Sequence, residues 1–304
     1  MTDDDDDDDD DDAATFALAL TRLDGVGRVT GHRLVERFDG PDDLRSHSRE
    51  QVFLRLKGLP SAEEITRRLF DTDELDDALR EARSEADALS ERGVAVLCPR
   101  SDAWPGGLDA LAPAERPLLL WAYGRAAVLE GPTAALLARP PMDEAPFERA
   151  QALAQHLTAA GAVPVLGAKS GFDVALAKRA AGEGAPVALV AACGLAKVPR
   201  KLRPVAGRAV RAGGLLLSPF PMDHGPFDHD DSDRARLQTA LARTAVFAPP
   251  TPDTPEACAL AWAADAGRPA FVLTDGPDAA PEHARPVRGP DDFAAVRESV
   301  IRDA

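Results

Sequence analysis

The chain has 304 residues, enough for one large or two modest domains, and its 51 acidic against 35 basic side chains give a formal net charge of −16. Ten of the acids form the uninterrupted run Asp3 to Asp12, and the remaining 41 acids against 35 bases leave −6. This balance excludes a strongly basic nucleic-acid domain and leaves only local basic patches for such a role. No run approaches the ~20 apolar residues needed to cross a bilayer, so we expect no membrane association and a cytoplasmic location.

Residues 1–12 repel one another and offer almost no side chain for burial, which predicts a disordered acidic tail. One interpretation of the tail is a nucleic-acid mimic that screens a basic groove. A role in solubility or salt adaptation is favoured over it.

Residues 13–92 have a helical pattern throughout. Regularly spaced leucines precede the turn Asp24-Gly25-Val26-Gly27, and apolar residues at helical spacing follow it. The pattern resembles a helix-hairpin-helix, whose glycine turn can offer backbone N–H groups to a phosphate, although a simple packing role is favoured. A long charged helix is expected over 73–92. We therefore predict a small all-helical domain of the helix-hairpin-helix or SAM-like kind.

From Gly93 onward, short apolar runs alternate with helical patterns. The expected strands lie at 94–97, 118–124, 134–138, 163–166, 187–192, 215–218, 245–248 and 270–273. The expected helices lie at 146–160, 173–182, 202–212, 233–242 and 255–266. Repeated units of this length predict an α/β domain over 93–280, with a Rossmann-like parallel sheet and helices on both faces. Residues 281–304 are expected to be a C-terminal extension.

The three cysteines, Cys98, Cys193 and Cys258, are far apart and flanked by apolar residues, so we expect buried thiols rather than a metal site or disulfides. His224 and His229 lie in an acidic loop, for which a solvated surface is favoured over a divalent-ion site. The sequence has no defensible catalytic constellation and no Gly-x-Ser-x-Gly elbow. We therefore expect neither catalysis nor a cofactor.

One turn is placed to bind an anion. Gly167, Lys169, Ser170 and Gly171 follow a predicted strand and open a predicted helix, where N–H groups point outward at the carboxyl edge of the sheet. The spacing is that of neither a Walker motif nor G-x-G-x-x-G. Phe172, the next residue, is the local candidate for base stacking, although a core position is favoured.

Arg234 and Arg236 begin a later helix and are expected near the same edge. Residues two apart do not share a helix face, so at most one arginine can point inward. We expect Arg234 to contact the ligand and Arg236 to be a packing or ion-pair partner.

Five segments in the same order and spacing resemble the DNA-processing protein A family (DprA, or Smf). They are Trp104 to Leu108 with Arg116 to Gly124, Leu166 to Asp173, Ala192 to Leu195, Gly213 to Pro221, and Arg234 to Leu237. The chain departs from the family pattern at several of them. Only Arg139 remains of a Gly-Ser-Arg turn, Ser170 stands at a basic position with Lys169 one residue earlier, and Ala235 replaces an asparagine.

The resemblance implies a protein that binds single-stranded DNA and assists loading of the recombinase RecA during transformation and recombination. It implies a homodimer, and after Gly276 too few residues remain for the winged helix of some members. Its implied DNA or anion contacts are Arg139, Gly167, Lys169, Ser170, Gly171, Arg234 and Arg236. Two alternatives stay open. One is a Rossmann-like sensor of a nucleotide or phosphorylated ligand, and the other is a nucleotide hydrolase using Asp173 or Glu256.

Overall fold

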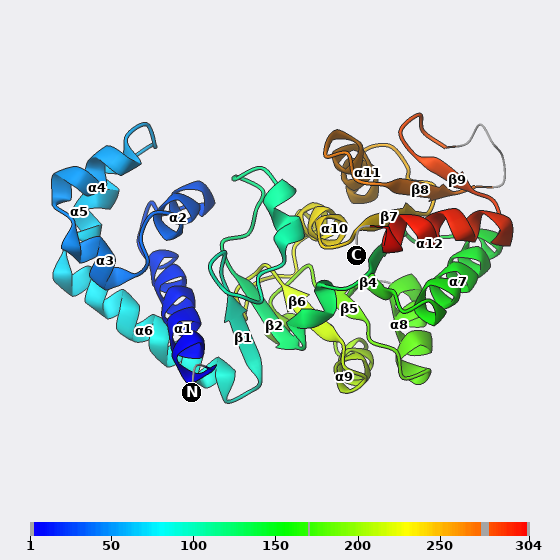
Figure 1. Cartoon of the computed structure of the whole chain (residues 1–304), viewed down its shortest axis with the longest axis horizontal. Coiled ribbons are helices and arrows are strands. Elements are labelled where there is room, and N and C mark those ends of the chain that lie inside the picture. The colour runs from blue at the N-terminus through cyan, green and yellow to red at the C-terminus, as the bar shows by residue number, and fades with distance from the viewer. Residues whose placement is uncertain (1–2, 170, 275–279, 303–304) are drawn as a thin grey trace. The chain divides into compact units, whose positions relative to one another are not determined.

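The computed structural model describes residues 3–169, 171–274 and 280–302 (Figure 1). The chain divides into two compact units. The first consists of Met1–Trp104 and Leu111–Trp121, and the second of Pro105–Ala110 and Ala122–Ala304. The sequence predicts that the helical domain ends at residue 92 and that the α/β domain begins at residue 93. The first unit extends past this boundary, because it includes the strand β1 (Val94–Leu97).

The first unit is built mainly from helices, as predicted. They are α1 (Asp3–Leu20), α2 (Arg28–Val35), α3 (Pro41–Ser46), α4 (Arg49–Leu56), α5 (Ala62–Leu69) and α6 (Thr72–Ser90). Helix α1 packs against α6 and α2, and the fully buried Phe16, Leu20 and Phe38 belong to its core. Gly25, in the turn before α2, has φ +86°, a conformation that glycine adopts at little cost. The expected helix, glycine turn and helix are therefore present.

Helix α1 begins at Asp3, within the aspartate run, so the structure differs from the predicted disordered tail. Asp12, the last residue of the run, lies 2.6 Å from Arg83 Nη2 of α6. The apolar segment after the run supplies the packing that a short isolated helix lacks. Residues 1–2 lie outside the described residues.

The second unit contains the parallel sheet. Strand β2 (Leu120–Gly124) spans the boundary between the units, and the strands that lie wholly in the second unit are β3 (Thr133–Leu137), β4 (Val163–Gly167), β5 (Ala188–Val190), β6 (Leu215–Ser218), β7 (Thr244–Phe247), β8 (Ala270–Leu273) and β9 (Arg285–Val287). Seven of these pair in the order β6-β5-β4-β3-β7-β8-β9, every pair parallel. The register places Leu136 of β3 beside both Leu166 of β4 and Val246 of β7. Burial of every residue of β3 to β8 explains why these six strands have nearly continuous apolar sequences.

Helices cover both faces of this sheet. They are α7 (Glu144–Ala159), α8 (Gly171–Gly182), α9 (Arg203–Arg211), α10 (Asp230–Ala240), α11 (Pro255–Asp265) and α12 (Phe293–Ile301). The 3-10 turns are η1 (Gly106–Ala110), η2 (Ala126–Leu129), η3 (Leu195–Lys197) and η5 (Pro290–Asp292). The chain runs one way from β3 to β6 and the opposite way from β6 to β9, so right-handed crossovers place α7, α8 and α9 on one face and α10 and α11 on the other. The predicted Rossmann-like fold is confirmed.

The C-terminal segment and the cysteines can be compared with the sequence-based expectations. The segment expected as a C-terminal extension also contributes to the sheet domain, because β9 joins the sheet edge and α12 buries Phe293, Val296 and Val300 in the main core. Cys258 is exposed, whereas Cys98 and Cys193 are buried. Helix α11 buries Glu256, Ala259, Leu260 and Ala263, which leaves position 258 on its outward side.

None of the helices within the described ranges combines the length and apolar character required to cross a membrane.

Candidate functional site

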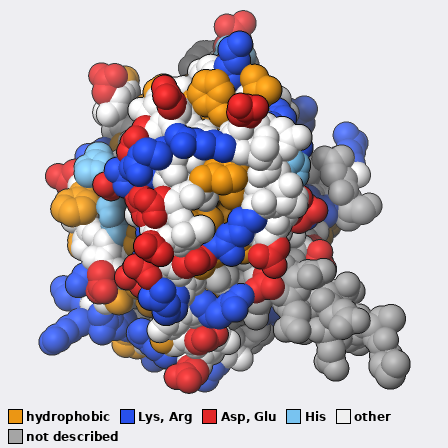
Figure 2. Space-filling model, turned by 90° about the vertical axis from the view of Figure 1, so that its left-hand side faces the viewer, with side chains coloured by type: hydrophobic (Ala, Val, Ile, Leu, Met, Phe, Trp, Pro, Cys, Tyr) orange, Lys and Arg blue, Asp and Glu red, His pale blue; other side chains and the backbone are white. Residues whose placement is uncertain are grey.

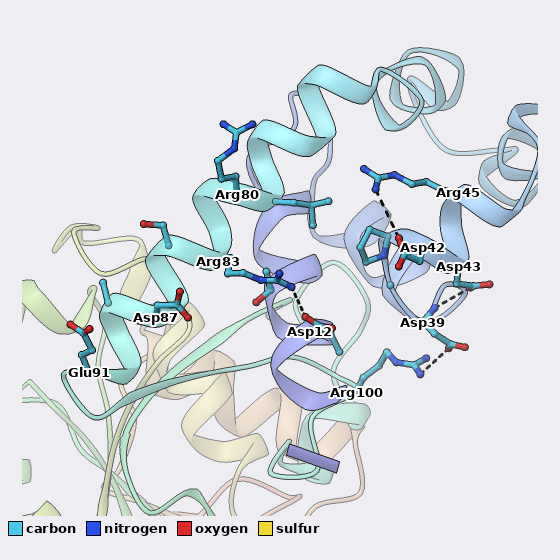
Figure 3. A pocket seen from close by; sticks show the side chains of 17 residues that line it. Asp12, Asp39, Asp42, Asp43, Arg45, Arg80, Arg83, Asp87, Glu91 and Arg100 are labelled. Atoms are coloured by element: carbon cyan, nitrogen blue, oxygen red, sulfur yellow. Dashed lines mark hydrogen bonds and ion pairs between the residues drawn. The ribbon is translucent and has the colours of Figure 1, made fainter. Parts of the chain in front are cut away.

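The helical unit has a cleft of about 1130 Å³, lined by parts of α1, α3 and α6 and by Arg100 (Figure 3). Its charged lining residues are Asp12, Asp39, Asp42, Asp43, Asp87 and Glu91, with Arg45, Arg80, Arg83 and Arg100. Arg83 pairs with Asp12 at 2.6 Å, and Arg100 pairs with Asp39 at 2.8 Å. Because carboxylates outnumber guanidiniums and lining aspartates pair with three of them, Arg83, Arg100 and, at 3.9 Å, Arg45, the cleft is unsuited to a polyanion.

The side of the helical unit seen in Figure 2 shows acidic and basic side chains interspersed. Ion pairs within this unit account for much of the mixture. Arg67 Nη2 lies 2.8 Å from Glu64 Oε1, and the hydrogen bond from Arg67 lowers the pKa of Glu64 to about 2. Local pairing of this kind leaves no large basic field on the described side chains of this unit, which does not favour it as the site of polyanion binding.

In the second unit, the carboxyl ends of β3 and β4 meet at one edge of the sheet, where ligands bind in open α/β folds. Arg139 follows β3 and is exposed. Lys169 follows β4 and its side chain is 55% exposed, and Gly171 opens α8 beside it. These sequence-predicted positions are therefore brought to the same edge, while Ser170 lies outside the described residues.

Arg234 lies in a buried polar network beneath this edge. Its side chain is 5% exposed, with Nε 3.0 Å from Asp231 Oδ1 and Nη2 3.3 Å from Glu256 Oε1. Arg236 keeps 21% of its side chain exposed and lies 3.7 Å from Asp233. Arg236 therefore has an ion-pair partner, as expected, whereas Arg234, the expected ligand contact, is itself buried between two carboxylates.

Gln238, one turn along α10 from Arg234, ties the network to the sheet. Its Oε1 accepts a hydrogen bond from Arg234 Nη1. Its amide nitrogen donates to Leu136 O and to Val165 O, both at 2.9 Å. One side chain thus bridges β3 and β4 and orients the arginine. Sequence reasoning missed Gln238, because nothing local marks a glutamine whose partners are backbone carbonyls far along the chain.

Lys169 and Asp231 form an ion pair above the buried arginine. Burial by itself would raise the pKa of Asp231, but Arg234 and Lys169 outweigh burial and hold that pKa below its usual value. Asp231 is therefore ionised at neutral pH and neutralises part of the charge of both cations. The Lys169 side chain as a whole is nevertheless half-exposed.

In the turn after β4, the position that an anion would take is occupied by a carboxylate of the chain itself. Gly167 N donates to Asp173 Oδ1 at 3.1 Å, and Asp173 is 6% exposed. A Cβ at position 167 would lie 3.1 Å from Arg234 Nη1, so the absence of a side chain there lets the arginine approach the backbone. The adjoining cavity has a volume of about 10 Å³, room for at most one water.

This packing does not favour the two alternative functions. A nucleotide or phosphorylated metabolite needs a far larger hollow than the one beside Gly167. Asp173 and Glu256, the carboxylates considered for hydrolysis, are both buried, the first against a backbone N–H and the second against Arg234. Among the described residues, no group of three His, Cys, Asp or Glu side chains is placed to hold a metal ion.

A third set of cations at this edge was missed by sequence reasoning. Lys197, Arg200, Lys201 and Arg203 follow β5 and are all exposed. This basic group could have been predicted from the sequence, because residues 184–222 contain six Lys or Arg and no acidic residue, in a chain of net charge −16. Sequence reasoning examined motifs and overlooked this local imbalance. Phe172, by contrast, is 5% exposed and belongs to the core, as favoured.

The fold and part of the chain match known proteins. A family model described as DNA recombination-mediator protein A matches residues 95–284. The solved structure of DNA processing protein A (DprA) from Streptococcus pneumoniae superposes with a TM-score of 0.59 at 17% identity, covering 89% of this chain and 98% of that one. A DprA structure from Helicobacter pylori, reported for its single-stranded DNA binding mode, gives 0.57 at 20% identity, covering 66% and 94%. No curated protein matches the chain. Since the family model spans more than half of the sequence, this chain belongs to the DNA recombination-mediator protein A (DprA) family.

Proposed function

We propose that this protein binds single-stranded DNA along the carboxyl edge of its parallel sheet and assists its transfer to RecA. The observation that carries the proposal is the row of exposed cations after three adjacent strands: Arg139 after β3, Lys169 after β4, and the Lys197 to Arg203 group after β5. A path of separated positive charges suits a flexible polyphosphate better than a compact ligand.

Family membership supports the rest of the proposal. The H. pylori relative is described by its single-stranded DNA binding mode, and the family by recombination mediation. RecA as the partner, a homodimeric assembly and a cytoplasmic location belong to the same proposal. We propose that the protein acts by binding and not by catalysis, since its buried carboxylates at this edge serve Gly167 and Arg234.

Changing Lys169 to glutamate should weaken binding of a single-stranded oligonucleotide by about 10- to 100-fold at low salt, because a charge-assisted phosphate contact becomes repulsive. The dependence of log K on log salt should also become shallower by about 0.7 for the lost contact. Fluorescence anisotropy titrations at several salt concentrations measure both quantities.

Lys178 provides the matched control. It is exposed on α8 about two turns farther from the strand ends, so Lys178→Glu makes the same charge change away from the proposed path. If both substitutions weakened binding equally, the effect would come from the net charge alone, and Lys169 would not be part of the binding site. Undetectable binding by the unaltered chain would refute the proposed function itself.

Deleting residues 3–12 should tighten binding of the same oligonucleotide at low salt, because the deletion removes ten negative charges from a chain of −16. The gain should vanish near molar salt, where the Debye length is only ~3 Å. Titrations of full-length and truncated protein, with thermal unfolding to confirm that both are folded, test this. An unchanged affinity at low salt would assign the run to solubility alone.

A further inference from the structure

Two aromatic pairs occupy the loop that follows β6. The rings of Phe220 and His224 stack at 4.6 Å between centroids, with an interplanar angle of 5°. The rings of Phe227 and His229 stack at 5.6 Å and 7°. The first pair is anchored by the buried Phe220, whereas Phe227 is 54% exposed and the His229 side chain is 79% exposed. The outer pair therefore presents flat ring surface to solvent.

The loop is held in place by Asp230, which is only 2% exposed. Its Oδ2 accepts a hydrogen bond from Phe227 N at 3.2 Å and lies 3.0 Å from His224 Nε2. Its Oδ1 lies 3.3 Å from His229 Nε2. Because one buried carboxylate fixes both the backbone of Phe227 and the neighbouring histidines, the exposed ring is positioned before any ligand arrives, which lowers the entropic cost of binding.

The aromatic loop is joined directly to the exposed cations that follow β5. Gly194 N donates to His224 O at 2.9 Å, and Ala196 N donates to Met222 O at 3.1 Å. Lys197 Nζ lies 3.3 Å from Asp223 Oδ1. Ring surface and positive charge therefore share one pair of loops at the carboxyl ends of β5 and β6.

We propose that Phe227, supported by His229, is a stacking platform for bases of single-stranded DNA whose phosphates lie on Arg200 and Lys201. Stacking suits this ring because every base has a π-face, and unpaired bases can leave their neighbours whereas duplex bases are already stacked. The assignment rests on the proposed function and extends it, since it names how this edge of the sheet distinguishes single strands.

The charges around the platform direct the strand. Asp223 engages Lys197, and Asp228, beside Phe227, is exposed. The carboxylates near the rings repel the DNA phosphates. The phosphates are therefore expected on the side of the loops toward α9, where Arg200 and Lys201 are exposed. The guanidinium of Arg203 donates to Val198 O and Ala196 O, which stiffens the turn between η3 and α9 without neutralising its charge.

The test uses the full chain and a fluorescein-labelled oligothymidylate longer than the ~16 nucleotides that a compact single-strand site covers. Phe227→Ala should weaken its binding by about 5- to 150-fold, since stacking on one base supplies that range, while the salt slope stays unchanged. Phe227→Tyr should keep near-normal affinity, because it retains the ring. Affinity for a duplex of similar length should be the same for wild type and Phe227→Ala.

The charge half of the proposal has a separate readout. The double variant Arg200→Gln/Lys201→Gln should make the salt slope shallower by about 1.4, for two lost phosphate contacts. Its matched control is Arg297→Gln/Arg302→Gln, at an exposed position of α12 and at the C-cap of that helix, which removes the same charge away from α9 and should leave the slope unaltered. Thermal unfolding verifies that each variant is folded, which the exposure of Phe227 favours.

The results separate the two levels of inference. If the wild-type chain binds the oligonucleotide and Lys169→Glu weakens it while Phe227→Ala binds as wild type, the platform is refuted and the proposed function survives. A slope change of equal size in the α12 control would overturn the phosphate assignment. Failure of the wild-type chain to bind would refute both.

Discussion

Replacing Arg234 with alanine should lower the free energy of unfolding by about 3–5 kcal/mol, because removing one partner of a buried ion pair leaves the buried carboxylate of Glu256 uncompensated. Asp231 and Glu256 would lose their common cation, and Gln238 would lose the donor to its Oε1. At about 2–4 °C per kcal/mol for a unit of this size, the melting temperature should fall by about 10 °C. Thermal and urea unfolding measure the effect.

Arg236→Ala is the comparison, since its ion pair with Asp233 spans 3.7 Å near the surface and contributes less than the buried one. Combining Arg234→Ala with Glu256→Gln should recover part of the loss, because one unpaired buried charge is then removed. A larger destabilisation by Arg236→Ala than by Arg234→Ala would contradict the network described for α10.

Gly194→Ala should destabilise the second unit by about 3 kcal/mol, at the upper end of the usual cost of overpacking. A Cβ at this position would overlap the carbonyl oxygens of Pro221 and Met222, which are backbone atoms and cannot move aside as a side chain can. The φ of Gly194 is −57°, so the cost is steric and not conformational. Urea denaturation followed by circular dichroism provides the measurement.

Gly182→Ala serves as its control, because nothing lies within 4 Å of a Cβ built at the end of α8. That variant should be as stable as wild type or slightly more so, by up to about 1 kcal/mol from the lower entropy of the unfolded chain. Equal stability of Gly194→Ala and wild type would show that the loops after β5 and β6 can separate without cost.

The sheet could be predicted from sequence because its strands are buried on both faces. Runs such as 163–166 and 270–273 are continuous in apolar residues, and helical patterns of regular length separate them. The strand β9 was missed for the opposite reason, since three residues, Arg285-Pro286-Val287, carry no periodicity. Its place in the sheet depends on tertiary pairing with β8.

The candidate site was only partly predictable. Strand ends and glycine turns located the edge correctly, because parallel strands gather their carboxyl ends there. What sequence could not supply was the pairing of charges across the fold. Arg234 and Asp231 are neighbours on one helix, but Glu256 comes from α11, and the carbonyls that hold Gln238 come from two strands. Burial of Arg234 is decided by these distant partners and not by its position at the helix start.

The hydrogen bond from Gly167 to Asp173 affects how the affinity of this edge should depend on the length of the DNA. With the turn already holding a carboxylate of its own, a single terminal phosphate has no dedicated receptor there. Under the proposed function, attraction is distributed among separate side-chain cations, each contributing modestly. Affinity then accumulates nucleotide by nucleotide as a strand reaches from one cation to the next, in the manner of a multivalent ligand. Under that function, short fragments and mononucleotides should compete poorly with long strands.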